Sequence, residues 1–386
     1  MRGGTGSVKS YKRLFTRSLA HIPAHRHAAA HSHHLRPDVV ERAALACLDD
    51  AFALADRKWD KFFGEVYPRA QAHVARLLGT GQPESIVFAS STHELLSRLI
   101  SCLPARARIL TTDAEFHSAD RQLRRLEESG GAVVTRVPAE PFGSFGERFA
   151  SAAREPHELA LLSHVFFNSG HVVPELEALV AALGDGVEFI AIDGYHAFLA
   201  LPVDLSRLAH RVFYLAGGYK YAMSGEGACF MHAPPGHGAR PIDTGWFAGF
   251  GALEAAATEG VAYPADATRF AGATLAPDGI YRLEAVLGLL AAEGVDAAVV
   301  HDRVARLQQQ FLERLASPAL PPDALLVNEP RGNFLTWRTP RAAELARRLL
   351  EAGIFVDHRG DRLRMGFGLY HDPDDIESLA AAVSER

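Results

Sequence analysis

The most constraining feature of this 386-residue sequence is one isolated lysine, Lys220, in its C-terminal two thirds. It follows the near-apolar run at residues 212–216 and a Gly-Gly pair. Elsewhere the chain uses arginine for positive charge, and its other lysines are Lys9, Lys12, Lys58 and Lys61. Lysine differs from arginine because its amine can lose a proton and act as a nucleophile. We therefore expect Lys220 to have a chemical role.

The residues before Lys220 predict two buried strands of a parallel sheet. Residues 189–192 form the first strand, which Asp193 closes, and residues 211–215 form the second. Ligands of open α/β sheets bind at the carboxyl ends of the strands, so Asp193 and Lys220 share the binding edge. This pair suits pyridoxal phosphate (PLP), because the lysine holds the aldehyde and the aspartate keeps the pyridine nitrogen protonated.

Two motifs in this stretch resemble those of a known family. Asp-Gly-Tyr-His at residues 193–196 resembles the Asp-x-x-His of fold-type I PLP enzymes of aminotransferase class V. Gly-Tyr-Lys-Tyr at residues 218–221, followed by Gly225 and Gly227, resembles the family's Ser-Tyr-Lys-Tyr and glycine turn. The kynureninase branch is the most similar. The alternative interpretation is a surface lysine and an ordinary aspartate at a strand end.

The resemblance implies roles for four of these residues. Lys220 is the Schiff-base lysine, and Asp193 is the partner of the ring nitrogen. His196 lies beside the ring and its phenolic oxygen, and Tyr219 reaches the phosphate.

The resemblance also implies the fold and its division. We expect an α/β fold-type I PLP-dependent transferase fold, with a mostly parallel seven-stranded sheet flanked by helices and a small α+β C-terminal domain. Residues 1–36 are expected to cover the active site, residues 37–278 to form the large PLP-binding domain, and residues 279–386 to form the small domain. Within the small domain, strands are expected near residues 334–337 and 354–357.

Three further positions are candidates for cofactor contacts. A Ser/Thr-rich turn after a strand at residues 84–88 opens a helix, and its N–H groups and hydroxyls suit an anion. We assign Ser91 and Thr92 to the phosphate; an ordinary helix cap is the alternative. Phe116, after the strand at residues 108–113, matches the family position that stacks on the pyridine ring, although a core phenylalanine has the same pattern.

Two later motifs point to a shared site. Gly-Trp-Phe at residues 245–247 resembles the Gly-Trp of kynureninases, which implies that the indole N–H of Trp246 reaches the phosphate. Residues 269–274 resemble Arg-Phe-x-x-Gly-Thr, a loop that the family supplies from the neighbouring subunit. The resemblance therefore implies a homodimer in which Thr274 completes the partner's phosphate cup. A packing tryptophan and a plain turn are the alternatives.

Two segments are candidates for substrate contacts. Residues 363–370 resemble the family's Leu-Arg-Phe-Gly-Phe-x-x-Leu-Tyr, which implies that the guanidinium of Arg364 grips the substrate α-carboxylate. Residues 21–34 contain six histidines, which indicate an active-site cover, a solvent-exposed loop or a metal site. We expect His33 and His34 to approach the substrate and assign no metal ligands.

The reaction is less constrained than the cofactor. Cysteine desulfurases need a catalytic cysteine on a C-terminal loop, and no cysteine follows Cys229. Phe166 and the Gly-Leu pair at residues 368–369 depart from the kynureninase pattern. We therefore expect a class V aminotransferase acting on an amino acid through a Schiff base at Lys220, with kynureninase-like hydrolysis of a Cβ–Cγ bond or β-elimination as alternatives.

Composition narrows the partners and the compartment. The net charge of −6 and the pI near 6.3 give no reason to expect nucleic acid or an anionic membrane. No apolar run reaches the roughly 20 residues of a membrane span. Three scattered cysteines suit a reducing compartment, so we expect a cytoplasmic protein.

Overall fold

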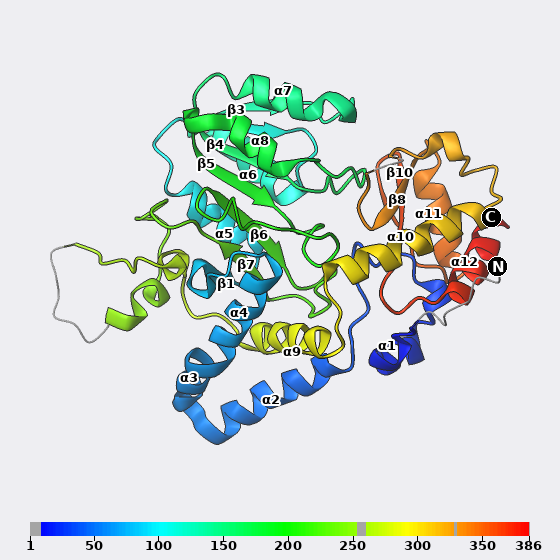
Figure 1. Cartoon of the computed structure of the whole chain (residues 1–386), viewed down its shortest axis with the longest axis horizontal. Coiled ribbons are helices and arrows are strands. Elements are labelled where there is room, and N and C mark those ends of the chain that lie inside the picture. The colour runs from blue at the N-terminus through cyan, green and yellow to red at the C-terminus, as the bar shows by residue number, and fades with distance from the viewer. Residues whose placement is uncertain (1–8, 253–259, 328–329, 386) are drawn as a thin grey trace, which may run out of the picture.

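The computed structural model describes residues 9–252, 260–327 and 330–385. A large unit is built around one sheet, and a smaller unit with its own short sheet lies at the other end of the molecule (Figure 1). The strands are β1 (Ile86–Ala89), β2 (Ala107–Thr112), β3 (Ala132–Val137), β4 (His157–Ser163), β5 (Val187–Asp193), β6 (Val212–Gly217), β7 (Cys229–His232), β8 (Phe334–Arg338), β9 (Asp357–Arg359) and β10 (Arg362–Gly366).

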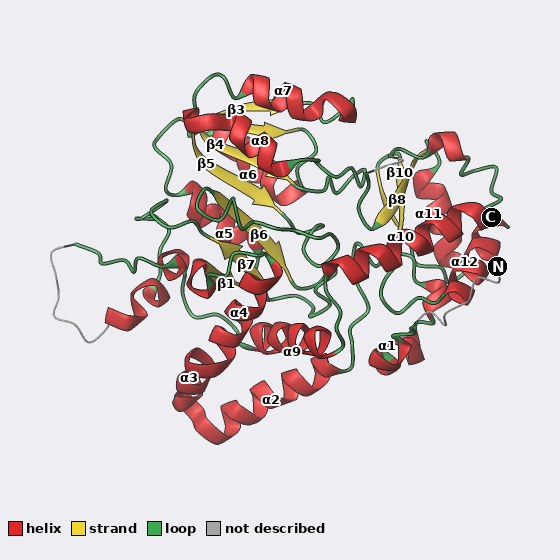
Figure 2. Ribbon diagram, viewed as in Figure 1, coloured by secondary structure: helices red, strands yellow, loops and turns green. Residues whose placement is uncertain are grey.

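Helices flank the large sheet and cover the small one (Figure 2). They are α1 (Thr16–His21), α2 (Val39–Leu54), α3 (Lys58–Lys61), α4 (Tyr67–Leu77), α5 (Thr92–Ile100), α6 (His117–Glu128), α7 (Phe145–Ala152), α8 (Leu176–Leu183), α9 (Asp278–Ala292), α10 (Ala297–Arg314), α11 (Ala342–Glu351) and α12 (Pro373–Ser384).

The large sheet has seven strands in the order β1-β7-β6-β5-β4-β2-β3. Strands β2 to β6 run parallel, and β7 is antiparallel to both β1 and β6. All six residues of β6 are buried, as a central parallel strand with helices on both faces requires. The fold-type I expectation of a mostly parallel seven-stranded sheet with flanking helices is confirmed.

The smaller unit contains the antiparallel sheet β8-β10-β9 together with α10, α11 and α12. Helix α9 lies against α2 and α4 in the large unit, and α10 leads into the small one. The boundaries at residues 36 and 278 stay predictions.

One predicted strand begins later than expected. The sequence predicts a strand at residues 354–357, whereas β9 begins at Asp357. The reason is that the backbone of Phe355 pairs with the N-terminal segment. The N–H of Ala28 donates to the carbonyl of Phe355 (2.8 Å), and the N–H of Phe355 donates to the carbonyl of Arg26 (2.8 Å). Backbone groups that a regular β9 would use are thus satisfied by the N-terminal segment.

The N-terminal segment crosses from the small sheet to the loop that carries Lys220. The N–H of Gly366 in β10 donates to the carbonyl of Ala28 (2.8 Å), and the N–H of Ala30 donates to the carbonyl of Gly366 (3.1 Å). Further along, the N–H of His34 donates to the carbonyl of Tyr219 (3.2 Å). The segment is therefore fixed at both sides.

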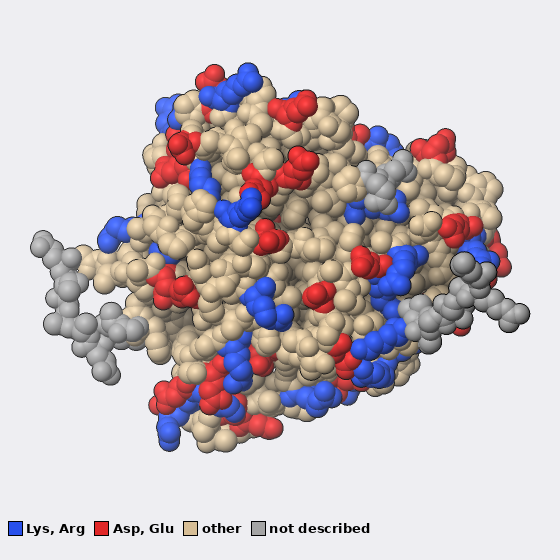
Figure 3. Space-filling view, in the orientation of Figure 1, with Lys and Arg blue, Asp and Glu red and all other residues tan. Residues whose placement is uncertain are grey.

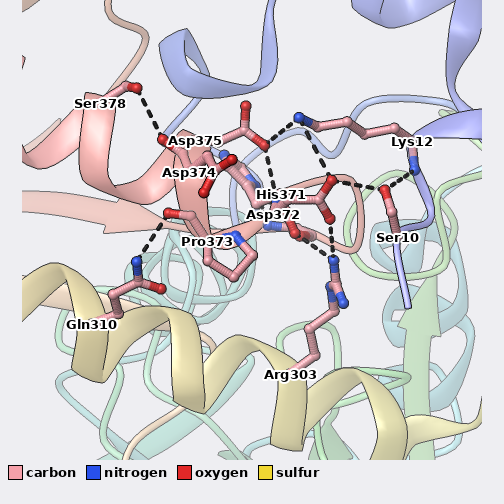
Figure 4. A network of polar contacts seen from close by, with 11 residues as sticks. Ser10, Lys12, Arg303, Gln310, His371, Asp372, Pro373, Asp374, Asp375 and Ser378 are labelled. Atoms are coloured by element: carbon pink, nitrogen blue, oxygen red, sulfur yellow. Dashed lines mark hydrogen bonds and ion pairs between the residues drawn. The ribbon is translucent and has the colours of Figure 1, made fainter. Parts of the chain in front are cut away.

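Ser10 and Lys12, at the start of this segment, contact the N-terminus of α12 (Figure 4). Asp372 caps that helix together with Asp375. The ammonium of Lys12 lies 2.7 Å from Asp375 and 3.6 Å from Asp372. The nearly buried Arg303 of α10 pairs with Asp372 at 2.8 Å, and Ser10 donates to it at 2.7 Å. The helix dipole stabilises carboxylates at a helix N-terminus. These two carboxylates also attract the ammonium of Lys12 and so bind the start of the chain to α12.

Helix α2 leaves several of its apolar side chains exposed. Val40 and Ala43 are buried, but Leu45, Leu48 and Phe52 are 54%, 51% and 80% exposed. Their spacing places them along one outward side of the helix. An exposed apolar stripe of this kind is typical of an interaction surface.

Charged side chains of both signs are interspersed over the face seen in Figure 3. Among the described residues, no helix is both long and apolar enough to cross a bilayer.

Tyr221 links the loop of Lys220 to the small unit, and its removal is expected to be costly. The buried hydroxyl lies 2.8 Å from the carbonyl oxygen of Asn333 and 2.9 Å from that of Phe367. Tyr221→Phe should lower the free energy of unfolding by about 1–3 kcal/mol, because buried carbonyls lose their donor. Urea unfolding measures this. The half-buried hydroxyl of Tyr263, 2.6 Å from the carbonyl of Pro241, provides the control Tyr263→Phe. Equal losses in the two variants would contradict the prediction.

Candidate active site

The amine of Lys220 is buried among aromatic rings. The side chain is only 5% exposed. Its Nζ lies 4.3 Å from the ring centroid of Tyr195, 5.3 Å from that of Tyr219 and 5.4 Å from that of Phe116. Burial lowers the pKa of Lys220 to about 8, although Asp193 opposes this shift. About a tenth of the amines are then neutral at pH 7, against about one in a few thousand for an ordinary lysine.

A tight turn after β6 brings Lys220 to this position. The N–H of Ser224 donates to the carbonyl of Gly218 (2.8 Å), and the N–H of Met223 donates to that of Lys220 (2.9 Å). A Cβ at Gly218 would lie 2.1 Å from the hydroxyl of Ser224 and 2.7 Å from the carbonyl oxygen of Gly225. Only glycine fits there, which explains the Gly-Gly pair before the lysine.

Asp193 ends β5 on the same edge of the sheet. Its Oδ1 accepts from the N–H of Tyr195 (2.8 Å), which fixes the carboxylate at the strand end. Burial raises the pKa of Asp193, while the N–H of Tyr195 and the charge of Lys220 lower it. A protonated ring nitrogen beside Asp193 would favour its ionised form further.

His196 and Phe116 lie near this pair. His196 is buried and packs against Phe334, with 5.3 Å between the ring centroids. Its Nδ1 has no hydrogen-bond partner within the described part of the chain. Phe116 is half-buried and meets Phe167 edge to face at 5.4 Å. Phe116 also lines a narrow cavity, whose other walls include Thr92, His93, Leu96, Leu161, Asp193 and Leu215.

Ser91 and Thr92 differ in what remains available to a ligand. The hydroxyl of Ser91 accepts from the N–H of Glu94 (3.2 Å), so Ser91 caps α5, and its contact with a phosphate stays a prediction. Thr92 is the first residue of α5 and lines the same cavity as Asp193 and Phe116. Helix N-termini are common sites for anions, so the position of Thr92 suits a phosphate.

Trp246 and Thr274 form a pair of their own. The indole Nε1–H of Trp246 donates to the hydroxyl of Thr274 (3.0 Å), and the indole is 42% exposed. Neither residue lines the cavity that Asp193 and Thr92 share. Arg269 is buried and donates to the carbonyls of Pro234 (2.8 Å) and Asp266 (2.7 Å), so it holds the loop itself.

Arg364 is buried and already engaged by protein groups. Its guanidinium donates to the carboxylate of Asp357 and to the carbonyl oxygen of Phe167. Asp357 also accepts from Arg359 at 2.6 Å. Burial lowers the pKa of Arg364 to about 10. A substrate carboxylate bound by Arg364 would have to share it with Asp357, whose charge weakens the attraction.

The histidine run divides into exposed and buried members. His33 is exposed, and its ring stacks on Tyr219 with 5.0 Å between centroids. His34 is buried, with Nδ1 2.7 Å from the carbonyl oxygen of Leu35. His27 is buried and contacts the hydroxyl of Tyr370 through Nδ1 at 2.5 Å. Among the residues described, no three His, Cys, Asp or Glu side chains are placed to hold a metal ion.

The sequence reasoning missed His31. This side chain is fully buried and stacks on Phe334, with 4.6 Å between centroids and an interplanar angle of 20°. His31 and His196 thus contact the same phenylalanine. A run of six histidines gives no sign of which member points inward, because no regular element sets its direction.

These residues fit PLP. Thr92 at the N-terminus of α5 suits a phosphate, the carboxylate of Asp193 suits a pyridinium, and both line the same narrow cavity. Phe116 on its wall suits the face of an aromatic ring. The partly neutral amine of Lys220 and the unpaired Nδ1 of His196 complete a donor set for an aldehyde and a phenolic oxygen.

Comparison with known proteins also indicates a PLP-dependent enzyme. Residues 35–379 match the family described as aminotransferase class-V. This chain belongs to that family. The class V resemblance seen in the sequence is therefore confirmed, and the cofactor of the chain is PLP.

Two relatives match most of the chain. A probable cysteine desulfurase of Vibrio cholerae is 24% identical over 342 residues, covering 81% of this chain and 81% of its own length. A kynureninase of Deinococcus radiodurans is 26% identical over 328 residues, covering 82% of this chain and 77% of its own.

Solved structures share the fold. The cystine C–S lyase C-DES, in complex with its product cysteine persulfide, has a TM-score of 0.82 at 19% identity, covering 95% of this chain and 98% of that one. A C-DES mutant with glycine covalently linked to its PLP cofactor has the same TM-score at 18% identity, covering 98% and 100%.

The lowered pKa of Lys220 predicts how PLP capture depends on pH. Only the neutral amine attacks the aldehyde, so the rate should rise from about pH 6, reach half its maximum near pH 8 and level off above about pH 9. Stopped-flow absorbance on the apoprotein measures this rate, and borohydride reduction with peptide mapping shows whether Lys220 carries the coenzyme. A midpoint near pH 10 would contradict the prediction.

Proposed function

We propose that this enzyme cleaves the bond between Cβ of an α-amino acid and its side-chain substituent. The observation that carries the proposal is the amine of Lys220, which is buried, partly neutral and held at the sheet edge beside Asp193. Such an amine can attach a coenzyme aldehyde, be displaced by a substrate amine and then take up the Cα proton.

Each of the other residues has a role toward that step. Bound PLP supplies the electron sink for the pair left at Cα. That pair then forms the Cα–Cβ double bond, and the expelled group leaves with the pair of its former bond to Cβ. The carboxylate of Asp193 would stabilise the protonated pyridine nitrogen of the coenzyme. Arg364 orients the substrate through its carboxylate, and Phe116 fixes one face of the site. The aromatic rings around Lys220 exclude water from its amine.

The cysteines favour release of the expelled group rather than its transfer to a protein thiol. The sequence contains Cys47, Cys102 and Cys229. Cys229 is buried beside the hydroxyl of Tyr195 (3.6 Å), and burial raises its thiol pKa to about 11. A thiol of this kind is a poor nucleophile at neutral pH. This supports a lyase whose products leave the site.

The relatives support cleavage at the side chain over transamination. Those reported above are named cysteine desulfurase, kynureninase and cystine C–S lyase, and these names concern removal of a side-chain group. Transamination, which the sequence favours, remains the second candidate because the family takes its name from that reaction.

Product analysis distinguishes the two reactions. The loaded enzyme is incubated with a panel of L-amino acids that includes cystine and kynurenine. We expect a released side-chain fragment, with the coenzyme returning to its starting spectrum. Lys220→Ala should lower turnover by at least about a thousandfold, since it removes the base at Cα. Accumulation of the pyridoxamine form with an intact side chain in the keto acid would overturn the proposed cleavage in favour of transamination.

We also propose that the enzyme is a homodimer with shared sites. The exposed stripe of Leu45, Leu48 and Phe52 on α2 and the exposed Trp246 support it, because a monomer would leave these apolar side chains in water.

A charge on this stripe tests the dimer. Phe52→Glu should weaken association at least about tenfold, since an interface would have to bury the carboxylate. Sedimentation velocity over a range of concentrations measures it. Leu350→Glu is the matched control, because Leu350 is 57% exposed on the distant α11. A wild-type monomer at all concentrations would contradict the proposal.

A further inference from the structure

His31 packs beside residues of the candidate site although it belongs to the N-terminal segment, because it shares Phe334 with His196. Hydrogen bonds between that segment and Gly366 place residues 28–30 alongside β10. A Cβ built on Gly366 would lie 2.6 Å from Nδ1 of His31. The imidazole therefore occupies the side-chain space of Gly366, which only glycine leaves open.

This position puts His31 on the same face of β10 as the side chain of Arg364. Residues i and i+2 of a strand point to one face and lie about 6.6 Å apart. Phe334 contacts all three side chains, which shows that His31, His196 and Arg364 lie close together. Its ring stacks on His31, packs against His196 at 5.3 Å and lies 5.8 Å from the guanidinium carbon of Arg364. Three polar groups thus surround one phenylalanine.

Both ring nitrogens of His31 are buried, and neither has a hydrogen-bond partner within the described residues. Buried polar groups without partners are uncommon, because desolvation is then uncompensated. A histidine that only filled space would be more stable as phenylalanine. Two unpaired nitrogens beside Arg364 point to a ligand as the missing partner.

We propose that His31 recognises the substrate side chain through a hydrogen bond, and that the substrate carries an oxygen acceptor bonded to its γ atom. This inference rests on the proposed function and narrows its substrate class. A substrate held by its α-carboxylate at Arg364 extends its side chain along the face of β10, toward the imidazole over Gly366.

The local charges select an acceptor over a donor. Burial and the nearby cations Arg364 and Lys220 keep His31 neutral by lowering its pKa far below the usual range. A neutral imidazole offers one N–H donor and one acceptor nitrogen. The positive field of Arg364, Lys220 and Arg359 favours a ligand atom that carries partial negative charge.

The test uses two amino acids of nearly equal shape. L-Asparagine carries an oxygen on its γ atom, and L-leucine carries methyl groups there. Their dissociation constants are measured from the change in the visible spectrum of the bound coenzyme, which requires no turnover. We expect the wild-type enzyme to prefer asparagine by about tenfold or more, since one buried hydrogen bond to a neutral group has about that effect.

His31→Phe keeps the stack on Phe334 and removes both nitrogens, so the preference for asparagine should disappear while leucine binding and PLP loading stay unchanged. His31→Gln and His31→Asn restore a donor near Nε2 or Nδ1, and one of them should recover part of the preference. His25→Phe, in the same segment, is the control for a general effect of the segment.

The outcomes separate this inference from the proposed function. An unchanged preference in His31→Phe would overturn the role of His31 and leave the enzyme assignment intact. Loss of PLP loading in His31→Phe and in both amide variants would also overturn it, since His31 would then act on the cofactor or the fold. A wild-type coenzyme spectrum that responds to no amino acid would overturn the proposed function itself, and the inference with it.

Discussion

The burial of one amine governs this structure. Removing the ammonium of Lys220 from water lowers its pKa to about 8, which leaves part of the amine neutral and reactive at physiological pH. The fold meets this requirement with the aromatic rings of Tyr195, Tyr219 and Phe116 and with a glycine-only turn after β6. Asp193 supplies the compensating negative charge from the neighbouring strand.

The site is completed by a segment that is remote in sequence. Charged contacts at the start of α12 hold the chain near Lys12, and hydrogen bonds to β10 and to Tyr219 hold residues 28–34 across the gap between the two sheets. This arrangement places His31 between Arg364 and the Lys220 loop. In the proposed function, cofactor chemistry belongs to the large sheet, and substrate discrimination belongs to the small sheet and the segment paired with it.

Much of the large unit could be predicted because its strands are fully buried. The apolar runs before Asp193 and Lys220 have one favourable environment, which is the centre of a parallel sheet. They therefore predicted both the parallel strands and the edge of the sheet at which a ligand binds. The small unit was less predictable. Residues 354–356 have strand-like composition, but their backbone pairs with the N-terminal segment, and local sequence does not report such a distant partner.

The sequence by itself determined the cofactor, through an isolated lysine, a strand-end aspartate and motifs whose spacing leaves little freedom. Only the tertiary structure decided which histidine of the run faces inward, against Phe334, and that the guanidinium of Arg364 donates to the carbonyl of Phe167. The reason is physical. A strand period or a helix cap acts over a few residues, whereas these contacts join segments hundreds of residues apart, and their geometry exists only once the two sheets have packed.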